Sequence, residues 1–199
     1  MKNEIGNNIL NVTNGMKVPN VERAMLSVMM HSIVFDSQRA IFDLVKLGHF
    51  TSALALLRVL FEAHVRGLWI NSCASEKQIY QFKKDSLKSS LNPTRKLDFD
   101  EMVKDVERVR PHLKGTLAEF KQNHWKGLNS LTHSGVMQCQ YNFENGEMRK
   151  IFSETHSETL MDFSKRFAIG SLADVGKITN DIEVIKMACY LGREHLDIG

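Results

Sequence analysis

The stretch that decides the fold is ALALLRVLFEAHVRGLWI, residues 53–70. It is apolar around almost the whole circumference of a helix, and only Arg58, Glu62 and Arg66 interrupt it with charge. A helix that is apolar on every side is buried inside its domain. The sequence therefore predicts a helix that starts near residue 51 and forms the centre of a bundle.

Start and stop signals divide the rest of the chain into further helices. Asn20 is a candidate N-cap for an amphipathic helix that ends near Leu47, before Gly48. The other predicted helices are 75–89, opened by a Ser75/Gln78 capping box; 98–110, opened by Asp98/Glu101; 114–132; 155–167, opened by Thr155/Glu158; and 171–194, opened by Ser171/Asp174 after a break at Gly170. The pattern predicts an all-α bundle of about six to eight helices, in one domain over residues 1–199.

One segment departs from helical periodicity. Residues 136–153 lose this periodicity, and the stretch YNFENGEMRKIF (141–152) alternates around Asn145-Gly146. Asn-Gly between alternating residues is the strongest short hairpin signal. The segment is predicted to be a hairpin or an irregular excursion between helices.

The composition is that of a soluble globular protein, but it does not indicate a function. The 199 residues are 43% hydrophobic and 25% charged, as in ordinary soluble globular domains, and the net charge of +3 is spread along the chain. No apolar run is long enough to span a membrane, and MKNEIGNNILNV at the start does not resemble a secretory signal, so a cytoplasmic protein is expected. Cys73, Cys139 and Cys189 show no C-x-x-C spacing and are predicted to be reduced, packed thiols.

The charges on the central helix are the first candidate site. Arg58, Glu62 and Arg66 follow one another at four-residue spacing, so their side chains form one stripe that reaches Trp69. The stripe has two interpretations. It is either an ion-pair ladder that satisfies itself at the edge of a groove, or a support in which Glu62 holds the Arg58 guanidinium ready for a phosphate or carboxylate.

The second candidate is the histidine in LNSLTHSG, residues 128–135. His133 lies over Lys126 and Asn129 on a polar helix face, whereas His124 lies on the opposite, apolar face. His133 is either a C-terminal cap that is favourable with the helix dipole, or a general acid or base with Lys126 and Asn129 as substrate contacts. His64, among leucines of the central helix, is expected to be a hydrogen-bonded core residue.

Other chemistries lack their sequence signatures. No H-E-x-x-H, E-x-x-H or H-x-x-x-H pair is present, so no metal is predicted. The chain also lacks a G-x-S-x-G elbow and a phosphate-binding glycine loop, and no cofactor is expected.

LLRVLFEAHVRGLWI (56–70), together with LNSLTHSGVMQCQYNFENGEMRKI (128–151), resembles a bacterial family of unknown function within the HEPN-like superfamily. The shared features are a central helix with R-x-x-x-E followed by W, and a later helix that ends in a polar residue, H and a small pair. The resemblance covers roughly residues 50–195. It implies a helical bundle, commonly a homodimer, and in many members a metal-independent ribonuclease of toxin-antitoxin or abortive-infection systems.

In those ribonucleases an arginine and a histidine four to six residues apart form the active pair. Here no arginine stands at that spacing before His133, where the sequence has Lys126 and Asn129. Arg58, held by Glu62, is the candidate to supply the missing guanidinium, from the same chain or across a dimer. The resemblance then implies RNA cleavage with His133 moving the proton and Arg58, Arg66 and Lys126 facing phosphate.

Two other functions remain open at this stage. The missing arginine favours a non-catalytic HEPN-like module that binds a nucleotide or a partner protein, such as a cognate antitoxin or another defence protein. A small-molecule enzyme or sensor that uses the central-helix charges in a pocket is the third. Met25, Met29 and Met30 are either a dimer seam or ordinary core.

Overall fold

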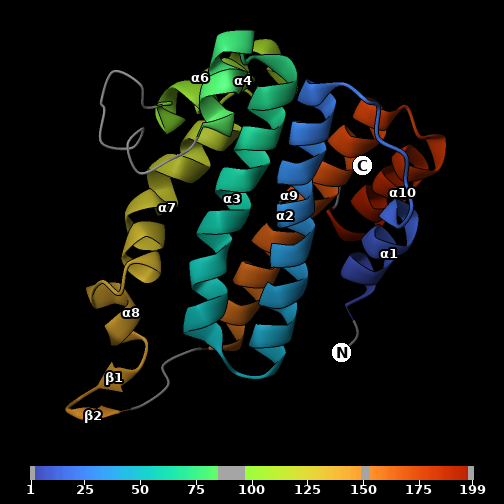
Figure 1. The fold of residues 1–199 in the computed structure, drawn as a ribbon. Coiled ribbons are helices and arrows are strands. Elements are labelled where there is room, and N and C mark those ends of the chain that lie inside the picture. The colour runs from blue at the N-terminus through green and yellow to red at the C-terminus, as the bar shows by residue number, and fades with distance from the viewer. Residues whose placement is uncertain (1–2, 85–96, 149–152, 197–199) are drawn as a thin grey trace.

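The computed structural model describes residues 3–84, 97–148 and 153–196, and these residues are mostly helical (Figure 1). The elements are α1 (Glu4–Thr13), α2 (Glu22–Lys46), α3 (Phe50–Ser72), α4 (Glu76–Lys83), α6 (Phe99–Val109), a 3-10 turn (Pro111–Leu113), α7 (Thr116–Thr132), α8 (Val136–Gln140), β1 (Phe143–Glu144), β2 (Glu147–Met148), α9 (Glu154–Thr179) and α10 (Ile182–His195). The predicted all-α bundle is confirmed. Within the described ranges there are nine α-helices rather than six to eight, because α1 and the short α8 were not expected.

The centre of the bundle is α3, as its sequence predicts. It lies between α2 and α7 in Figure 1, and it also packs against α6 and α9. Leu60, Phe61, Val65 and Ile70 have no exposed surface. The Phe61 ring contacts one phenylalanine ring on each of three other helices, and these contacts hold α3 against α6, α7 and α9. Even with this apolar helix included, no described helix is long and apolar enough to cross a membrane.

Gly67 sets the close approach of α2 to α3. The His31 ring from α2 lies over it, and a Cβ at residue 67 would stand 2.7 Å from His31 Cε1. The Gly67 carbonyl oxygen also accepts a hydrogen bond from Ser27 Oγ at 2.8 Å. Any larger residue at position 67 therefore pushes α2 and α3 apart.

We expect Gly67→Ala to lower the free energy of unfolding by about 1 to 3 kcal/mol, because overpacking a buried contact outweighs the helix propensity that alanine adds. Gly127→Ala on α7 is the matched control, since its Cβ would meet only the Met137 side chain, with Cε at 3.6 Å. That variant should gain about 0.5 to 1 kcal/mol. Urea denaturation measures both, and equal shifts for the two would contradict the close approach.

The N-terminal boundary of α2 differs from the prediction. Asn20 is not the N-cap; the helix begins at Glu22 with Val21 in the cap position and no side-chain cap. The reason is a tight turn before it, in which Val21 N donates to the Pro19 carbonyl at 2.7 Å. By contrast, the Ser75/Gln78 capping box is confirmed.

The break predicted at Gly170 is wrong. α9 continues to Thr179, and it stops where Asn180 adopts a left-handed φ of 53° and Asp181 caps α10. A single glycine costs a helix only about 1 kcal/mol, less than burial of the apolar face of α9 contributes. The α9 start is also corrected: Ser153 and His156 form its capping box, not Thr155 and Glu158.

The predicted hairpin is confirmed within the segment 136–153. Phe143 pairs with Met148 across the turn, and Asn145 and Gly146 both have positive φ, as a type I′ turn requires. Two other predictions, the helix end near Ser89 and the last residues of this segment, lie outside the described residues.

Candidate functional site

The three charges of α3 form the predicted stripe at the edge of the bundle. Arg58 donates from Nε to Glu62 Oε1 over 2.7 Å, and Arg66 Nη2 lies 3.1 Å from Glu62 Oε2. The side chains of Arg58, Glu62 and Arg66 are 20%, 18% and 38% exposed, so the stripe is partly buried. Each carboxylate oxygen of Glu62 contacts one of the two arginines. Arg58 therefore has its Nε fixed while its Nη groups stay available.

One of those groups contacts His133. Arg58 Nη1 lies 2.8 Å from His133 Nε2, across 75 positions of sequence. Arginine nitrogens only donate, so this hydrogen bond requires a neutral imidazole whose Nε2 accepts and whose proton lies on Nδ1. The sequence-based pairing of Arg58 with His133 is thus a direct contact within one chain.

The end of α7 explains why His133 reaches α3. His133 is the C-cap residue, with its backbone N–H bonded to the Asn129 carbonyl, and Ser134 follows with a left-handed φ of 55°. Gly135 then turns back onto α7, where a Cβ would stand 2.3 Å from Ser130 Oγ. His133 therefore ends α7 as its C-cap residue and also contacts Arg58 on α3.

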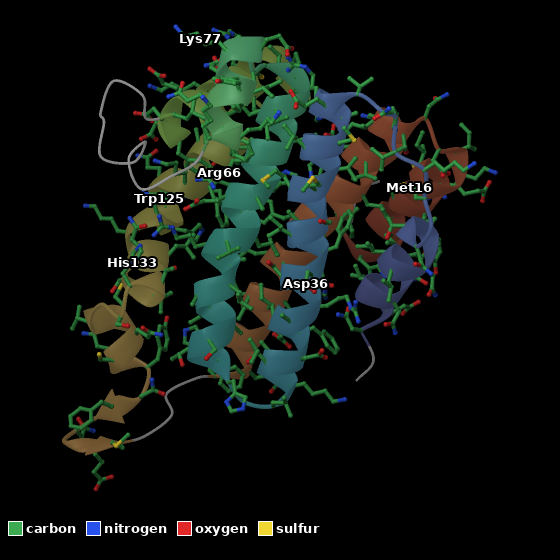
Figure 2. All side chains as sticks on the ribbon, viewed as in Figure 1. Met16, Asp36, Arg66, Lys77, Trp125 and His133 are labelled. Atoms are coloured by element: carbon green, nitrogen blue, oxygen red, sulfur yellow. The ribbon has the colours of Figure 1, made fainter. Side chains whose placement is uncertain are left out.

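Trp125 belongs to this site and was missed by the sequence reasoning. Its ring stacks on Phe99 at a centroid distance of 5.1 Å, and the Arg58 guanidinium and the Lys121 ammonium lie 4.9 and 4.7 Å from its centroid. An aromatic residue eight positions before His133 was the available signal. Figure 2 shows Trp125 and His133 on α7, beside the α3 helix that carries Arg66.

The remaining candidates supply unpaired polar groups. Arg66 Nε and Asn129 Oδ1 are buried and have no hydrogen-bond partner among the described residues. Lys126 is exposed, and it forms no hydrogen bond or ion pair with any residue the structure describes. Unpaired buried polar atoms are unfavourable unless water or a ligand satisfies them. With two arginines and one glutamate in the stripe, the site as a whole favours an anion.

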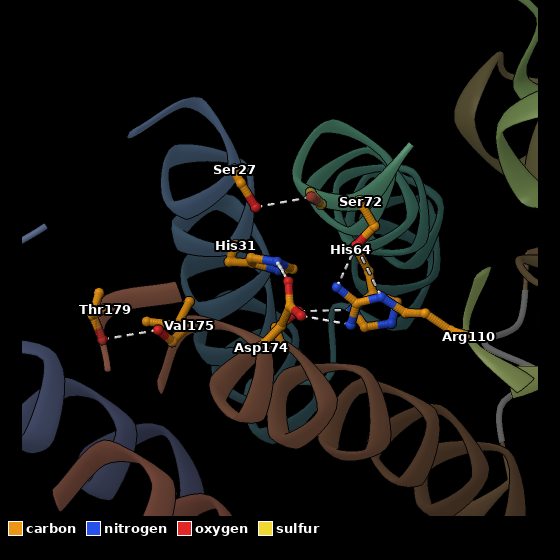
Figure 3. A network of polar contacts seen from close by, with 10 residues as sticks. Ser27, His31, His64, Ser72, Arg110, Asp174, Val175 and Thr179 are labelled. Atoms are coloured by element: carbon orange, nitrogen blue, oxygen red, sulfur yellow. Dashed lines mark hydrogen bonds and ion pairs between the residues drawn. The ribbon is translucent and has the colours of Figure 1, made fainter. Parts of the chain in front are cut away.

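A second polar cluster, which the sequence reasoning did not predict, lies where α2, α3 and α9 meet (Figure 3). Asp174 on α9 is 2% exposed; its Oδ2 is 3.0 Å from His31 Nε2 and its Oδ1 is 2.5 Å from Arg110 Nη1. Burial raises the pKa of Asp174, but the contact with His31 and the charge of Arg110 outweigh it and hold the pKa below its usual value.

His64 is the hydrogen-bonded core residue that its sequence context predicts. Its Nδ1 lies 2.8 Å from Ser171 Oγ. Burial, with His31 close by, lowers the pKa of His64 to about 3. His64 is therefore neutral at physiological pH. His124 packs its half-buried ring against Phe120 and Phe163, as expected of the apolar face of α7.

The cysteines differ from the prediction of packed thiols. All three are free, but Cys139 and Cys189 are exposed and only Cys73 is partly buried. The reason is their place on solvent-facing turns of α8 and α10. In the described part of the chain, no group of three or more histidine, cysteine, aspartate or glutamate side chains is placed to hold a metal ion.

A family model matches most of the chain. The family model described as "Family of unknown function (DUF6988)" matches residues 31–195, which include the α3 stripe, His133 and Asp174. No curated protein and no solved structure matches the chain. Since the match spans most of its length, the chain belongs to the DUF6988 family.

Proposed function

We propose that this protein is a HEPN-like, metal-independent endoribonuclease of the toxin or phage-defence type. The observation that carries the proposal is the 2.8 Å contact between Arg58 Nη1 and His133 Nε2. The HEPN-like resemblance implies an arginine and a histidine on one helix. Here the same two groups come together from α3 and α7, which supports the replacement of the missing arginine by Arg58.

The proposed reaction uses the nucleophile that RNA carries. His133 Nε2 takes the proton of a 2′-hydroxyl, the 2′-oxygen bonds to the adjacent phosphorus, and the bond from phosphorus to the 5′-oxygen breaks, with water protonating the leaving oxygen. Arg58 moves its Nη groups from Nε2 onto the phosphate oxygens while Glu62 keeps its Nε in place. The products are a 2′,3′-cyclic phosphate and a 5′-hydroxyl. DNA lacks this hydroxyl and would not react.

Substrate contacts are assigned to the unpaired groups around this pair. Arg66 and Lys126 carry the positive charge that binds neighbouring phosphates, and Asn129 offers an unsatisfied amide. Unpaired RNA suits an open edge between two helices, because its bases and backbone are accessible to side chains, whereas the bases of a duplex are paired and stacked. The proposal places the protein in the cytoplasm, where such RNA is found.

Expression in bacteria of wild type and His133→Ala tests the proposal. We expect wild type to slow growth and to produce new RNA ends that carry a 2′,3′-cyclic phosphate, and His133→Ala to produce neither, since its base is gone. His112→Ala, at an exposed histidine that is not one of the candidate site residues, is the control and should behave as wild type. Circular dichroism checks that each variant folds. Wild type without cleavage, or unchanged ends in His133→Ala, would overturn the proposal.

A second candidate is a binding module for a protein, which the surface of α2 favours. Met25, Met29 and Ile33 recur every four residues and are 38%, 58% and 38% exposed, so the helix presents an apolar stripe. The homodimer and the antitoxin or defence partner belong to this proposal. A tight complex in solution that Met29→Glu disrupts and His133→Ala leaves intact would support it over the ribonuclease.

A further inference from the structure

A cavity of about 650 Å³ lies between α9, α10 and the turn that follows α6. It shares no residue with the Arg58 and His133 site. Its volume is in the range of pockets that enclose a drug-sized ligand. The family match and the proposed ribonuclease leave this cavity without a role.

The walls of the cavity are mostly apolar. Leu68 from α3, Ile169 and Ala173 from α9, and Ile185 and Ala188 from α10 all contribute to the lining. His64 also lines it, and its pKa of about 3 leaves that ring uncharged at neutral pH. An apolar molecular body therefore packs against these walls without desolvating a charge on His64.

The charged groups around the cavity are of nearly one sign. Arg110, Arg166, Lys177 and Arg193 line it, against the single carboxylate of Asp174. That carboxylate is already committed, with one oxygen on His31 and the other on Arg110. It does not neutralise the remaining cations.

Two of the four cations have no acidic partner among the residues that the structure describes. Arg110 contacts Asp174 and Ser72, and Arg166 donates to Asp162 at 2.6 Å. Lys177 and Arg193, by contrast, make no ion pair with any residue in the described ranges. An apolar chamber with uncommitted cations is complementary to an anion that carries an apolar body.

We propose that this cavity binds a small amphipathic anion, with an aromatic or aliphatic body in the chamber and one carboxylate, sulfonate or phosphate group on Lys177 and Arg193. The ligand is a free molecule rather than a membrane lipid, because the volume of about 650 Å³ matches a drug-sized body. The site is independent of the proposed ribonuclease, and its test does not use RNA.

The test compares two dyes with the same rings. 8-Anilinonaphthalene-1-sulfonate carries the anionic group, and N-phenyl-1-naphthylamine lacks it. We expect the sulfonate to bind the folded wild-type chain saturably, at one molecule per chain, by fluorescence titration. Lys177→Gln with Arg193→Gln should weaken sulfonate binding about ten-fold through loss of charge-assisted hydrogen bonds. Binding of the neutral dye should change less than about two-fold, because the apolar walls that it uses are intact.

Three controls place the dye in this cavity. Lys186→Gln removes a cation of α10 outside the lining and should leave both dyes unaffected. Ala173→Phe should fill the chamber and weaken both dyes. Cys189 lines the cavity and Cys139 does not, so bound sulfonate should slow alkylation of Cys189 alone. Three results would each overturn the proposal: absence of saturable binding, an unchanged sulfonate affinity in the Lys177 and Arg193 variant, or alkylation of Cys189 that bound sulfonate does not slow. Near-ultraviolet circular dichroism checks that the variants are folded.

Discussion

Arg58→Ala is expected to reduce the rate of RNA cleavage by about 10²- to 10³-fold, the scale of losing one preorganised group that stabilises charge in the transition state. The side chain contacts Glu62 through Nε, His133 through Nη1 and the face of Trp125. The variant loses the charge at the phosphate and the hydrogen bond that orients the imidazole. The measurement is a single-turnover rate on a short unpaired RNA, with circular dichroism to confirm folding.

Arg58→Lys separates charge from geometry. Lysine keeps the positive charge but cannot hold Glu62 and His133 through two fixed donors, so it should recover only part of the lost rate. Arg108→Ala is the matched control, because Arg108 is 74% exposed on α6 and lies outside the site. Full activity in Arg58→Ala, or an equal loss in Arg108→Ala, would remove Arg58 from the proposed mechanism.

Local signals in the sequence were sufficient for much of the fold. The apolar circumference of residues 53–70 leaves α3 no stable place except the centre, and Asn145-Gly146 specifies its own turn. The break at Gly170 failed because tertiary packing decides whether a helix tolerates one glycine. The true break, at Asn180 and Asp181, carried a signal in the left-handed preference of asparagine and the capping preference of aspartate.

The sequence predicts the contacts within α3 at the candidate site, but not the contact between α3 and α7. Glu62 and its two arginines follow from four-residue spacing, which is local geometry. The Arg58 and His133 contact joins two helices, so no spacing rule reaches it, and the family resemblance alone suggested the pair.

Two residues were missed for the same physical reason. Trp125 looks like core from its helix position, and Asp174 looks like part of a capping box, because both have an ordinary local role available. A carboxylate among the buried residues Leu172 and Val175 was the remaining signal for Asp174. A buried carboxylate needs cationic partners, and a single sequence does not reveal that His31 and Arg110 supply them.

We expect Asp174→Ala to lower the free energy of unfolding by about 3 to 5 kcal/mol, the cost of removing one partner from a buried ion pair. His31 has no exposed surface, and the Arg110 side chain is 14% exposed, so in a region that water hardly reaches the variant leaves His31 without its carboxylate partner and Arg110 with only the neutral Ser72 hydroxyl. Total stabilities of 5 to 15 kcal/mol are usual for domains, so this loss is large. Urea denaturation followed by circular dichroism measures it.

Asp162→Ala makes the same substitution on the same helix and is the control. Asp162 pairs with Arg166 four residues on, and their side chains are 43% and 50% exposed, so solvent screens the interaction. Its loss should cost no more than about 0.5 kcal/mol. Asp174→Asn should fall between the two, because the amide keeps the shape and one acceptor but loses the charge that faces Arg110. If Asp174→Ala lowered the free energy of unfolding no more than Asp162→Ala, the cluster would not hold α2, α9 and the end of α6 together. Arg110 and Asp174 also line the cavity, and that part of its wall would then have to be stabilised by apolar residues alone.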